Sequence, residues 1–371
     1  MEAPTRRNLD EVLNWRPPHG VLSLYLDVDP ADRSEGWRIE LRNGLDAAVA
    51  GADDHERRLA VEATARRISG SILREPLESA GAGLVGFIEA AREEATTRWY
   101  VSRLPPRRTG AFYGAAPVIS PLVELLDRGG PLGMAALSSE RVRLLHWYLG
   151  RIREVREWEL EVFSLDWRER KAPVPRDPAA GEAVSSAGRD QFDQRLEANR
   201  ERFAEDSGRQ SAAEAAGRGW RELLVFGDER YARHFAAGFA DRCPLRHVDS
   251  SDLISEPTRA IEDRLEGLLE AMSQDQKRKL VENALEERCA FGYQETMQAL
   301  AEGRVEHLLY DCERRYEPDR AEGPADLADE RSPVEQMIRL ALGSGARVTP
   351  LIGEAAAGLT EKGGVVGTLR Y

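Results

Sequence analysis

The sequence predicts an α/β protein built from three α/β domains in series. Helical and strand patterns alternate along the whole chain, which is typical of sheets covered by helices. The chain has 371 residues, which is too long for one typical domain. Hydrophobic residues make up 42% of it, an ordinary share for a chain that forms packed cores. We expect the domains at residues 1–132, 133–270 and 271–371.

The first domain opens with an apolar run of alternating character at residues 20–30, which predicts a strand that stops at Pro30. It closes at residues 116–131, where a short helix ends in Gly-Gly-Pro. Between these points the patterns predict helices at 37–50 and 55–73 and strands at 82–90 and 97–104.

The second domain is expected to begin with three strands, and Gly150-Arg151 is the expected turn of a hairpin. A loop rich in Pro, Ala and charge at 168–189 then leads into a long polar helix at 190–217. The strands are expected at 134–137, 142–148, 152–159, 221–229 and 245–248, with helices at 229–241 and from about 255. In the third domain we expect helices at 273–290 and 334–343 and a strand at 347–352.

Composition excludes several classes of function. The net charge is −13 and the acidic excess is spread along the chain, which disfavours indiscriminate nucleic-acid binding but leaves a specific RNA contact open. Cys243, Cys289 and Cys312 lie far apart without CxxC spacing, which favours buried thiols over a zinc site. Neither a leader peptide nor an 18-residue apolar run is visible. We therefore expect a cytoplasmic protein without a membrane or DNA partner, and without a metal or cofactor.

Three smaller features allow more than one interpretation. Asp27 and Asp29 share a face of the first strand and could hold a divalent ion, but solvated acids at a strand end are the favoured reading. The six histidines are scattered without metal-ligand spacing, so we expect structural or surface roles for them. Four aromatic residues could stack nucleic-acid bases, although such residues are more often core: Trp147, Tyr148, Trp158 and Trp167.

The loop at 168–189 carries the candidate RNA-binding residues. Either it is a solvated linker, or it is an arm that places its cations against phosphates. The residue types alone leave both interpretations open. The candidates are Arg168, Arg170, Lys171, Arg176 and Arg189.

The last quarter of the chain resembles the C-terminal domain of archaeo-eukaryotic class I peptide chain release factors and Pelota. The run Ala-Leu-x-x-Gly is typical of a helix closed by glycine, and Val-Glu-x-Leu-Leu is typical of a buried strand. LSLYLDV in the first domain and residues 134–217 in the second resemble the family more weakly. The positions that match are Phe291, Gly292, Thr296, Ala299, Leu300, Gly303, Val305, Glu306, Leu308, Gly363, Gly364, Arg370 and Tyr371.

This resemblance implies a release-factor-like, tRNA-shaped protein that enters the ribosomal A site. In the family a Gly-Gly-Gln tripeptide at a loop tip enters the peptidyl transferase centre, and its Gln helps to place the attacking water. The register puts Gly188-Arg189-Asp190-Gln191 at this point, and Arg and Asp do not readily adopt dihedral angles that only glycine allows. The Asn-Ile-Lys-Ser loop with which eukaryotic members read stop codons is also absent from residues 48–60.

The resulting hypothesis is a ribosome A-site-binding factor of the bacterial branch, acting in hibernation or rescue without peptidyl-tRNA hydrolysis. Its expected partners are the rRNA of the A site and peptidyl transferase centre, and a translational GTPase. One alternative is a peptidyl-tRNA hydrolase that uses Gln191, the single catalytic candidate. The other is a ribosome-independent scaffold that binds RNA or protein.

Overall fold

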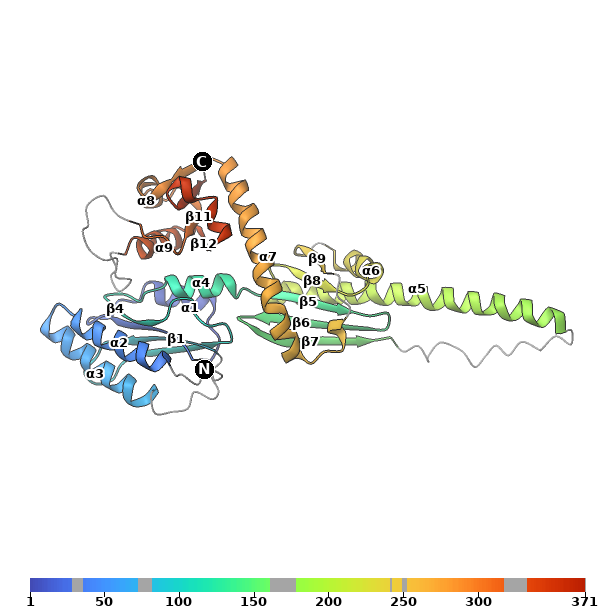
Figure 1. Cartoon of the computed structure of the whole chain (residues 1–371), viewed down its shortest axis with the longest axis horizontal. Helices are drawn as coiled ribbons and strands as arrows, with labels where there is room; N and C mark the ends of the chain where they lie inside the picture. The colour runs from blue at the N-terminus through green and yellow to red at the C-terminus, as the bar shows by residue number, and fades with distance from the viewer. Residues whose placement is uncertain are drawn as a thin grey trace. The chain divides into compact units, whose positions relative to one another are not determined.

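The computed structural model describes the chain except for residues 29–35, 73–81, 161–177, 241, 249–251, 317–331 and 371 (Figure 1). Only the backbone is described for residues 71–72, 178–192, 252, 263 and 266. Contacts divide the chain into two compact units, Met1–Gly129 with Glu266–Tyr371, and Gly130–Leu265. The described residues form three sheets, one in each of the segments 1–129, 130–265 and 266–371. The α/β class is therefore confirmed, while the division at 132 and 270 stays a prediction.

The first segment forms an antiparallel sheet in the order β3-β2-β1-β4. Its strands are β1 (Val21–Asp27), β2 (Gly83–Glu89), β3 (Thr97–Ser102) and β4 (Gly110–Gly114). Helices α2 (Gly36–Ala50) and α3 (His55–Ile72) cover one face, and α1 (Arg6–Leu13) and α4 (Ser120–Arg128) lie on the other (Figure 1). On that second face the Tyr25 hydroxyl donates to the carbonyl of Val118 at 2.6 Å. Burial on both faces explains why β1 is an almost unbroken apolar run.

The third segment forms a mixed sheet in the order β10-β13-β11-β12. Its strands are β10 (Cys289–Phe291), β11 (Val305–Asp311), β12 (Arg347–Leu351) and β13 (Val365–Leu369), and its helices are α8 (Gly292–Ala301), α9 (Pro333–Gly343) and α10 (Glu354–Ala357). Strands β11 and β12 are parallel, and α9 lies between them in the chain as the helix of the crossover. Gly303 follows α8 with φ 68°, so the glycine that closes this helix is where the sequence predicts it.

The middle segment forms a five-stranded sheet in the order β7-β6-β5-β8-β9. Its strands are β5 (Leu132–Leu137), β6 (Arg141–Tyr148), β7 (Arg151–Glu159), β8 (Leu223–Phe226) and β9 (Leu245–Val248), and its helices are α5 (Pro178–Arg218) and α6 (Glu229–Phe239). Strands β5, β6 and β7 form an antiparallel meander, while β8 runs parallel to β5 and β9. Leu144 and Val225 of the sheet pack in one core with Phe235 and Phe239 of α6.

A buried carboxylate joins the first and third segments. Glu335 in α9 is 1% exposed, and its oxygens accept hydrogen bonds from the backbone N–H groups of Ile119, at 3.0 and 3.1 Å, and Ser120, at 2.7 Å. Helix α4 begins at this point and has no side-chain cap of its own. The neighbouring Arg339 donates to the carbonyl of Leu13 at 2.9 Å. The cap of α4 therefore comes from α9, which lies far away in the sequence.

Three helix predictions need correction. The predicted loop at 168–189 is wrong in its second half, because α5 begins at Pro178 and not at residue 190. The helices expected from 255 and at 273–290 are one continuous helix, α7 (Thr258–Glu286). Gly267 is the one glycine inside α7, and the helix continues through it. Nothing lies within 4 Å of the place where a Cβ would be, so no neighbouring group packs closely against the helix at this glycine. Helix α1 was missed because it is short, although its Thr5–Asn8 capping box is visible in the sequence.

None of the helices in the described ranges is both long and apolar enough to cross a bilayer.

Candidate functional site

The candidate arm starts from the hairpin of β6 and β7. Leu149 and Gly150 form its two-residue turn with φ values of 51° and 81°, one residue earlier than the predicted Gly150-Arg151 turn. Positive φ at both central residues is typical of a type I′ turn, whose twist suits a hairpin. Strand β7 ends at Glu159, two positions before residues 161–177, which the structure does not describe.

The arm continues in α5, the longest described helix (Figure 1). Gly188-Arg189-Asp190-Gln191 lies inside this helix, ten residues or more after its start at Pro178, and not at a loop tip. The local sequence explains the earlier start. Pro178 suits the first turn, and the alanines that follow it are strong helix formers.

The predicted RNA-binding residues fall in two places. Arg168, Arg170, Lys171 and Arg176 lie outside the described residues. Arg189 lies in α5, as does Gln191, and in both cases only the backbone is described. Their joint action on RNA therefore stays a prediction.

Two glycines hold α5 tightly against α6. A Cβ on Gly208 would lie 2.1 Å from the carbonyl oxygen of Phe235, and one on Gly238 would lie 1.9 Å from that of Glu205. Real Cβ contacts are never this short, so the two helices cross with their backbones in contact. The base of the arm is consequently fixed on the sheet by packing that tolerates no larger residue.

Charge on the described part of α5 is largely paired. Arg209 contacts Glu205 at 3.0 Å, and Arg230 of α6 contacts Glu201 at 2.7 Å. The hydrogen bond from Arg230 also holds the pKa of Glu201 below its usual range. Arg195 has no ion pair within the described residues, but Asp193 lies two positions before it. Arg202 is also exposed and makes no ion pair within the described residues, and it follows Arg195 by seven positions, so the two lie on one face of α5.

The four candidate stacking residues do not form one platform. Trp147 is 6% exposed and belongs to the core. Trp158 packs partly against the core, and its indole N–H donates to Gln210 at 3.0 Å. Trp167 lies outside the described residues. Tyr148 is half-buried next to His146, a residue that the sequence prediction did not select.

The described residues form neither a metal-binding cluster nor a reactive thiol site. No group of three or more His, Cys, Asp or Glu side chains among them could hold a metal ion. Asp27 is exposed at the end of β1, and Asp29 lies outside the described residues. All three cysteines are free, and burial raises the pKa of Cys312 to about 12. A thiol with such a pKa is inert at neutral pH.

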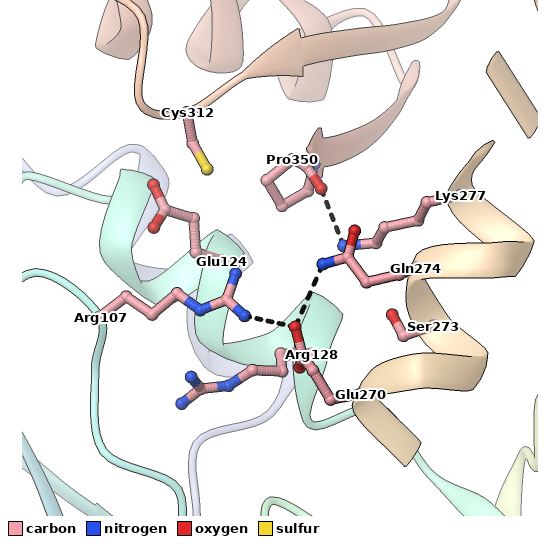
Figure 2. A pocket seen from close by; sticks show the side chains of 9 residues that line it. All are labelled: Arg107, Glu124, Arg128, Glu270, Ser273, Gln274, Lys277, Cys312 and Pro350. Carbon is pink, nitrogen blue, oxygen red and sulfur yellow. Dashed lines mark hydrogen bonds and ion pairs between the residues drawn. The ribbon is translucent and has the colours of Figure 1, made fainter. Parts of the chain in front are cut away.

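A polar cavity lies between the first and third segments. Figure 2 shows the nine residues that line it: Arg107, Glu124, Arg128, Glu270, Ser273, Gln274, Lys277, Cys312 and Pro350. Its charges are paired, because Arg107 contacts Glu270 at 2.8 Å and Lys277 donates to the carbonyl of Pro350 at the same distance. Its volume of about 10 Å³ has room for roughly one water molecule. The cavity is thus a structural feature and has no room for a substrate.

Two carboxylates of this cavity have pKa values shifted in opposite directions. Burial raises the pKa of Glu124, and this outweighs the opposing charge of Arg108 at 3.4 Å. Burial acts in the same direction on Glu270, but the hydrogen bond from Gln274 and the charge of Arg107 hold its pKa below its usual range. Such a pair could serve as acid and base only if a substrate reached it, and the cavity excludes one.

A larger open groove of about 570 Å³ runs between α2 and α3. Leu45, Val49 and Ala65 supply its apolar side chains, and the charged residues around them include both signs, such as Arg42 and Asp46. Nothing in the described residues indicates what would cover it.

The meander, the long arm helix and the sheet of the middle segment form the part of the chain that a family model matches. Residues 117–265, from just before α4 to the end of the middle unit, match the family described as "Bacterial archaeo-eukaryotic release factor family 10". The match includes the arm with Gln191 and the predicted RNA-binding residues. The predicted resemblance is confirmed: the chain is release-factor-like, and the family match covers residues 117–265 of it.

Solved structures of low sequence identity are also similar to the chain. An archaeal translation termination factor, aRF1, is 18% identical, with 99% of this chain and 97% of that chain covered and a TM-score of 0.25. Pelota from Archaeoglobus fulgidus is 16% identical over 78% of this chain and 79% of its own, with a TM-score of 0.32. An archaeal Pelota, from a model of ribosome-bound Pelota and ABCE1, is 13% identical over 100% and 95%, with a TM-score of 0.43. Among curated proteins, none matches the chain.

Proposed function

We propose that this protein is a cytoplasmic factor that binds the ribosomal A site in hibernation or rescue and does not hydrolyse peptidyl-tRNA. The family match over residues 117–265 supports the release-factor part of the proposal. The single observation that carries the remainder is the setting of Gln191. It lies inside a 41-residue helix, and the residues before it are Gly188, Arg189 and Asp190 in place of Gly-Gly.

The physical reason lies in the backbone that hydrolysis requires. A loop tip that positions water with a Gln side chain uses dihedral angles open mainly to glycine. A residue inside a helix has helical dihedral angles and is hydrogen-bonded to the turns before and after it. An Asp next to Gln191 would also repel the phosphates of a tRNA end. The arm therefore suits occupation of the site better than catalysis there.

Peptide release separates this proposal from the hydrolase alternative. Purified protein added to ribosomes that carry labelled peptidyl-tRNA should release no peptide above the spontaneous rate. Release that disappears in Gln191→Ala, and persists in the neighbouring control Gln194→Ala, would establish the hydrolase instead. Both glutamines belong to α5, so the two variants remove the same amide from the same helix.

Ribosome binding separates the proposal from the scaffold alternative. The protein should co-sediment with ribosomes, and replacing Arg168, Arg170, Lys171 and Arg176 by Ala should weaken binding. Removal of each cation that touches a phosphate should flatten the log–log salt dependence by about one unit. Unchanged affinity and slope would make the segment a tether only, and absence of co-sedimentation would leave the scaffold.

For the third segment we propose a contact with a partner translation factor, a translational GTPase. Its support is the pattern from Phe291 to Leu308, which resembles the C-terminal domain of the release factors. Yeast Dom34, another of the similar structures, is described as interacting with Hbs1. Exchange of exposed α8 residues such as Gln298 and Glu295 should weaken recovery of such a GTPase without affecting ribosome binding.

A further inference from the structure

A second cationic surface lies at the turn end of the β6–β7 hairpin. His146 and Tyr148 of β6 are paired with Arg153 and Arg151 of β7, and directly paired residues of antiparallel strands project to the same face. Arg218, at the end of α5, is close enough for its charge to act on the His146 imidazole. We call these five residues the hairpin patch.

The hairpin patch holds more positive than negative charge, although Glu262 accepts a hydrogen bond from the backbone N–H of Ile152 at 2.8 Å, between the two arginines of β7. Arg151 and Arg153 are exposed, and neither makes an ion pair or hydrogen bond within the described part of the chain. Arg218 contacts Glu214 at 3.1 Å. Glu154 is paired with Leu145, which puts it on the opposite face, where it contacts the buried Arg143 at 2.8 Å. The hairpin patch thus concentrates cations on a chain whose net charge is −13.

The imidazole in the patch is held as a hydrogen-bond donor. The indole N–H of Trp220 can only donate, and it lies 2.8 Å from Nδ1 of His146. Nδ1 is therefore the acceptor, and the ring proton of the neutral imidazole is on Nε2, which has no partner among the described residues. Burial, followed by the charges of Arg218 and Arg153, lowers the pKa of His146. At neutral pH the ring is uncharged, with its tautomer set by Trp220.

Three rings form a stack beneath the arginines. The His146 ring lies 6.3 Å from that of Trp220, at 20° between planes, and 6.3 Å from that of Tyr148, at 16°. The stack is rigid at its inner end, because a Cβ on Gly133 would lie 2.3 Å from the Trp220 indole. Tyr148 is the half-buried outer member, so part of its ring faces solvent. A stacked ring beside free guanidinium groups is the combination that binds single-stranded nucleic acid.

We propose that the hairpin patch binds an RNA strand, with the guanidinium groups of Arg151 and Arg153 on phosphates and the ring of Tyr148 against a base. The inference rests on the proposed function in naming RNA as the partner. The His146 Nε2–H would donate to a phosphate or 2′-hydroxyl oxygen. An acidic protein segment would satisfy the arginines but would not use the half-buried ring of Tyr148. The observations therefore favour RNA.

The experiment uses the full chain and a labelled 12-nucleotide RNA of mixed sequence, with binding followed by fluorescence anisotropy between 50 and 200 mM salt. The test variant is Arg151→Gln with Arg153→Gln. The matched control is Arg233→Gln with Arg242→Gln, which removes two exposed charges from the same unit away from the patch. The test variant should weaken binding on the order of tenfold and flatten the salt slope by roughly 1.4, since each contact with a single strand contributes about 0.7. The control should bind like the parent.

A second measurement follows the imidazole. In the histidine-labelled full chain, bound RNA should raise the pKa of His146, because a phosphate beside the ring favours its charged form, which the charges of Arg218 and Arg153 oppose. The resonance is assigned with His146→Gln. Equal RNA affinity of the parent and the test variant would overturn the proposal, and so would an equal loss of RNA affinity in the test and control variants. A His146 pKa that does not change on RNA binding would also overturn it, as would a polyglutamate peptide that displaces the labelled RNA as well as unlabelled RNA does. Failure of the protein to co-sediment with ribosomes would disprove the proposed function, but it would not affect the measured binding of RNA by the hairpin patch.

Discussion

Replacement of Glu335 by Ala should uncouple the first and third segments. The carboxylate is 1% exposed and accepts hydrogen bonds from the Ile119 and Ser120 amides at the start of α4. Removing it leaves two buried N–H groups without an acceptor, and each charge-assisted bond is worth about 1.5–3 kcal/mol. The substitution also removes a negative charge from the positive end of the helix. We expect unfolding of this unit to become easier by roughly 3–5 kcal/mol.

The assay is thermal unfolding combined with amide hydrogen exchange. For a unit of this size the expected destabilisation corresponds to a fall in Tm of roughly 6–20 °C. Exchange at Ile119 and Ser120 should accelerate more than exchange in the middle segment. Glu335→Gln keeps one acceptor and should lose less than half as much. Glu306→Ala is the matched control, because Glu306 is exposed and its contact with Arg347 at 3.5 Å is worth little. Equal Tm values for Glu335→Ala and Glu306→Ala would refute the reasoning.

Three further predictions test the packing and the pH dependence. Gly208→Ala should destabilise the middle unit by about 1–3 kcal/mol in urea unfolding, because the added Cβ meets α6. Gly217→Ala, which has nothing within 4 Å of the added Cβ, should stabilise the unit by about 0.5–1 kcal/mol. A change of the same sign in both variants would contradict the close crossing of α5 and α6. Burial lowers the pKa of His307 to about 4 from 6.5, so the unfolded chain takes up the proton first and the stability from this group is lost as pH falls from about 6.5 towards 4. The difference in unfolding free energy between the parent and His307→Asn should therefore shrink over that window, and a constant difference would disprove the assignment. Arg143→Leu should cost about 2–4 kcal/mol, because the guanidinium donates to the carbonyls of Ile254 and Glu256 at 3.1 and 2.8 Å; an unfolding midpoint equal to that of the parent would exclude this role.

Much of the fold could be predicted from local patterns. The strand 245–248 and the helix that begins at His55 were placed at the observed residues, because a periodicity of two or of 3.6 needs only a few neighbouring residues to be visible. The glycine after α8 and the buried strand that follows it were readable for the same reason. The resemblance to release factors came mainly from such local motifs in the last quarter of the chain, and the family match supports it from another part, residues 117–265.

The start of α5 was harder to predict, because its first residues combine Pro, Gly and Ser with Ala. Single glycines and serines weaken a helix by amounts that neighbouring alanines can offset, so the pattern of residues 168–189 resembled a loop throughout. The error mattered for the site, since it placed Gly188 and Gln191 at a loop tip when they lie within a helix.

The sequence by itself determined most of the helices and strands, although not the start of α5, the continuity of α7 or helix α1, because those preferences act over a few positions. Only the tertiary structure decided that Glu335 caps a helix 215 residues away, that Gly208 and Gly238 let two helices touch, and that His146 meets Trp220 and two arginines. Apart from the contact of His146 with Arg153 in the same hairpin, each of these contacts joins groups that are distant in the chain. Their geometry depends on how sheets and helices pack, and no local pattern of residues records it.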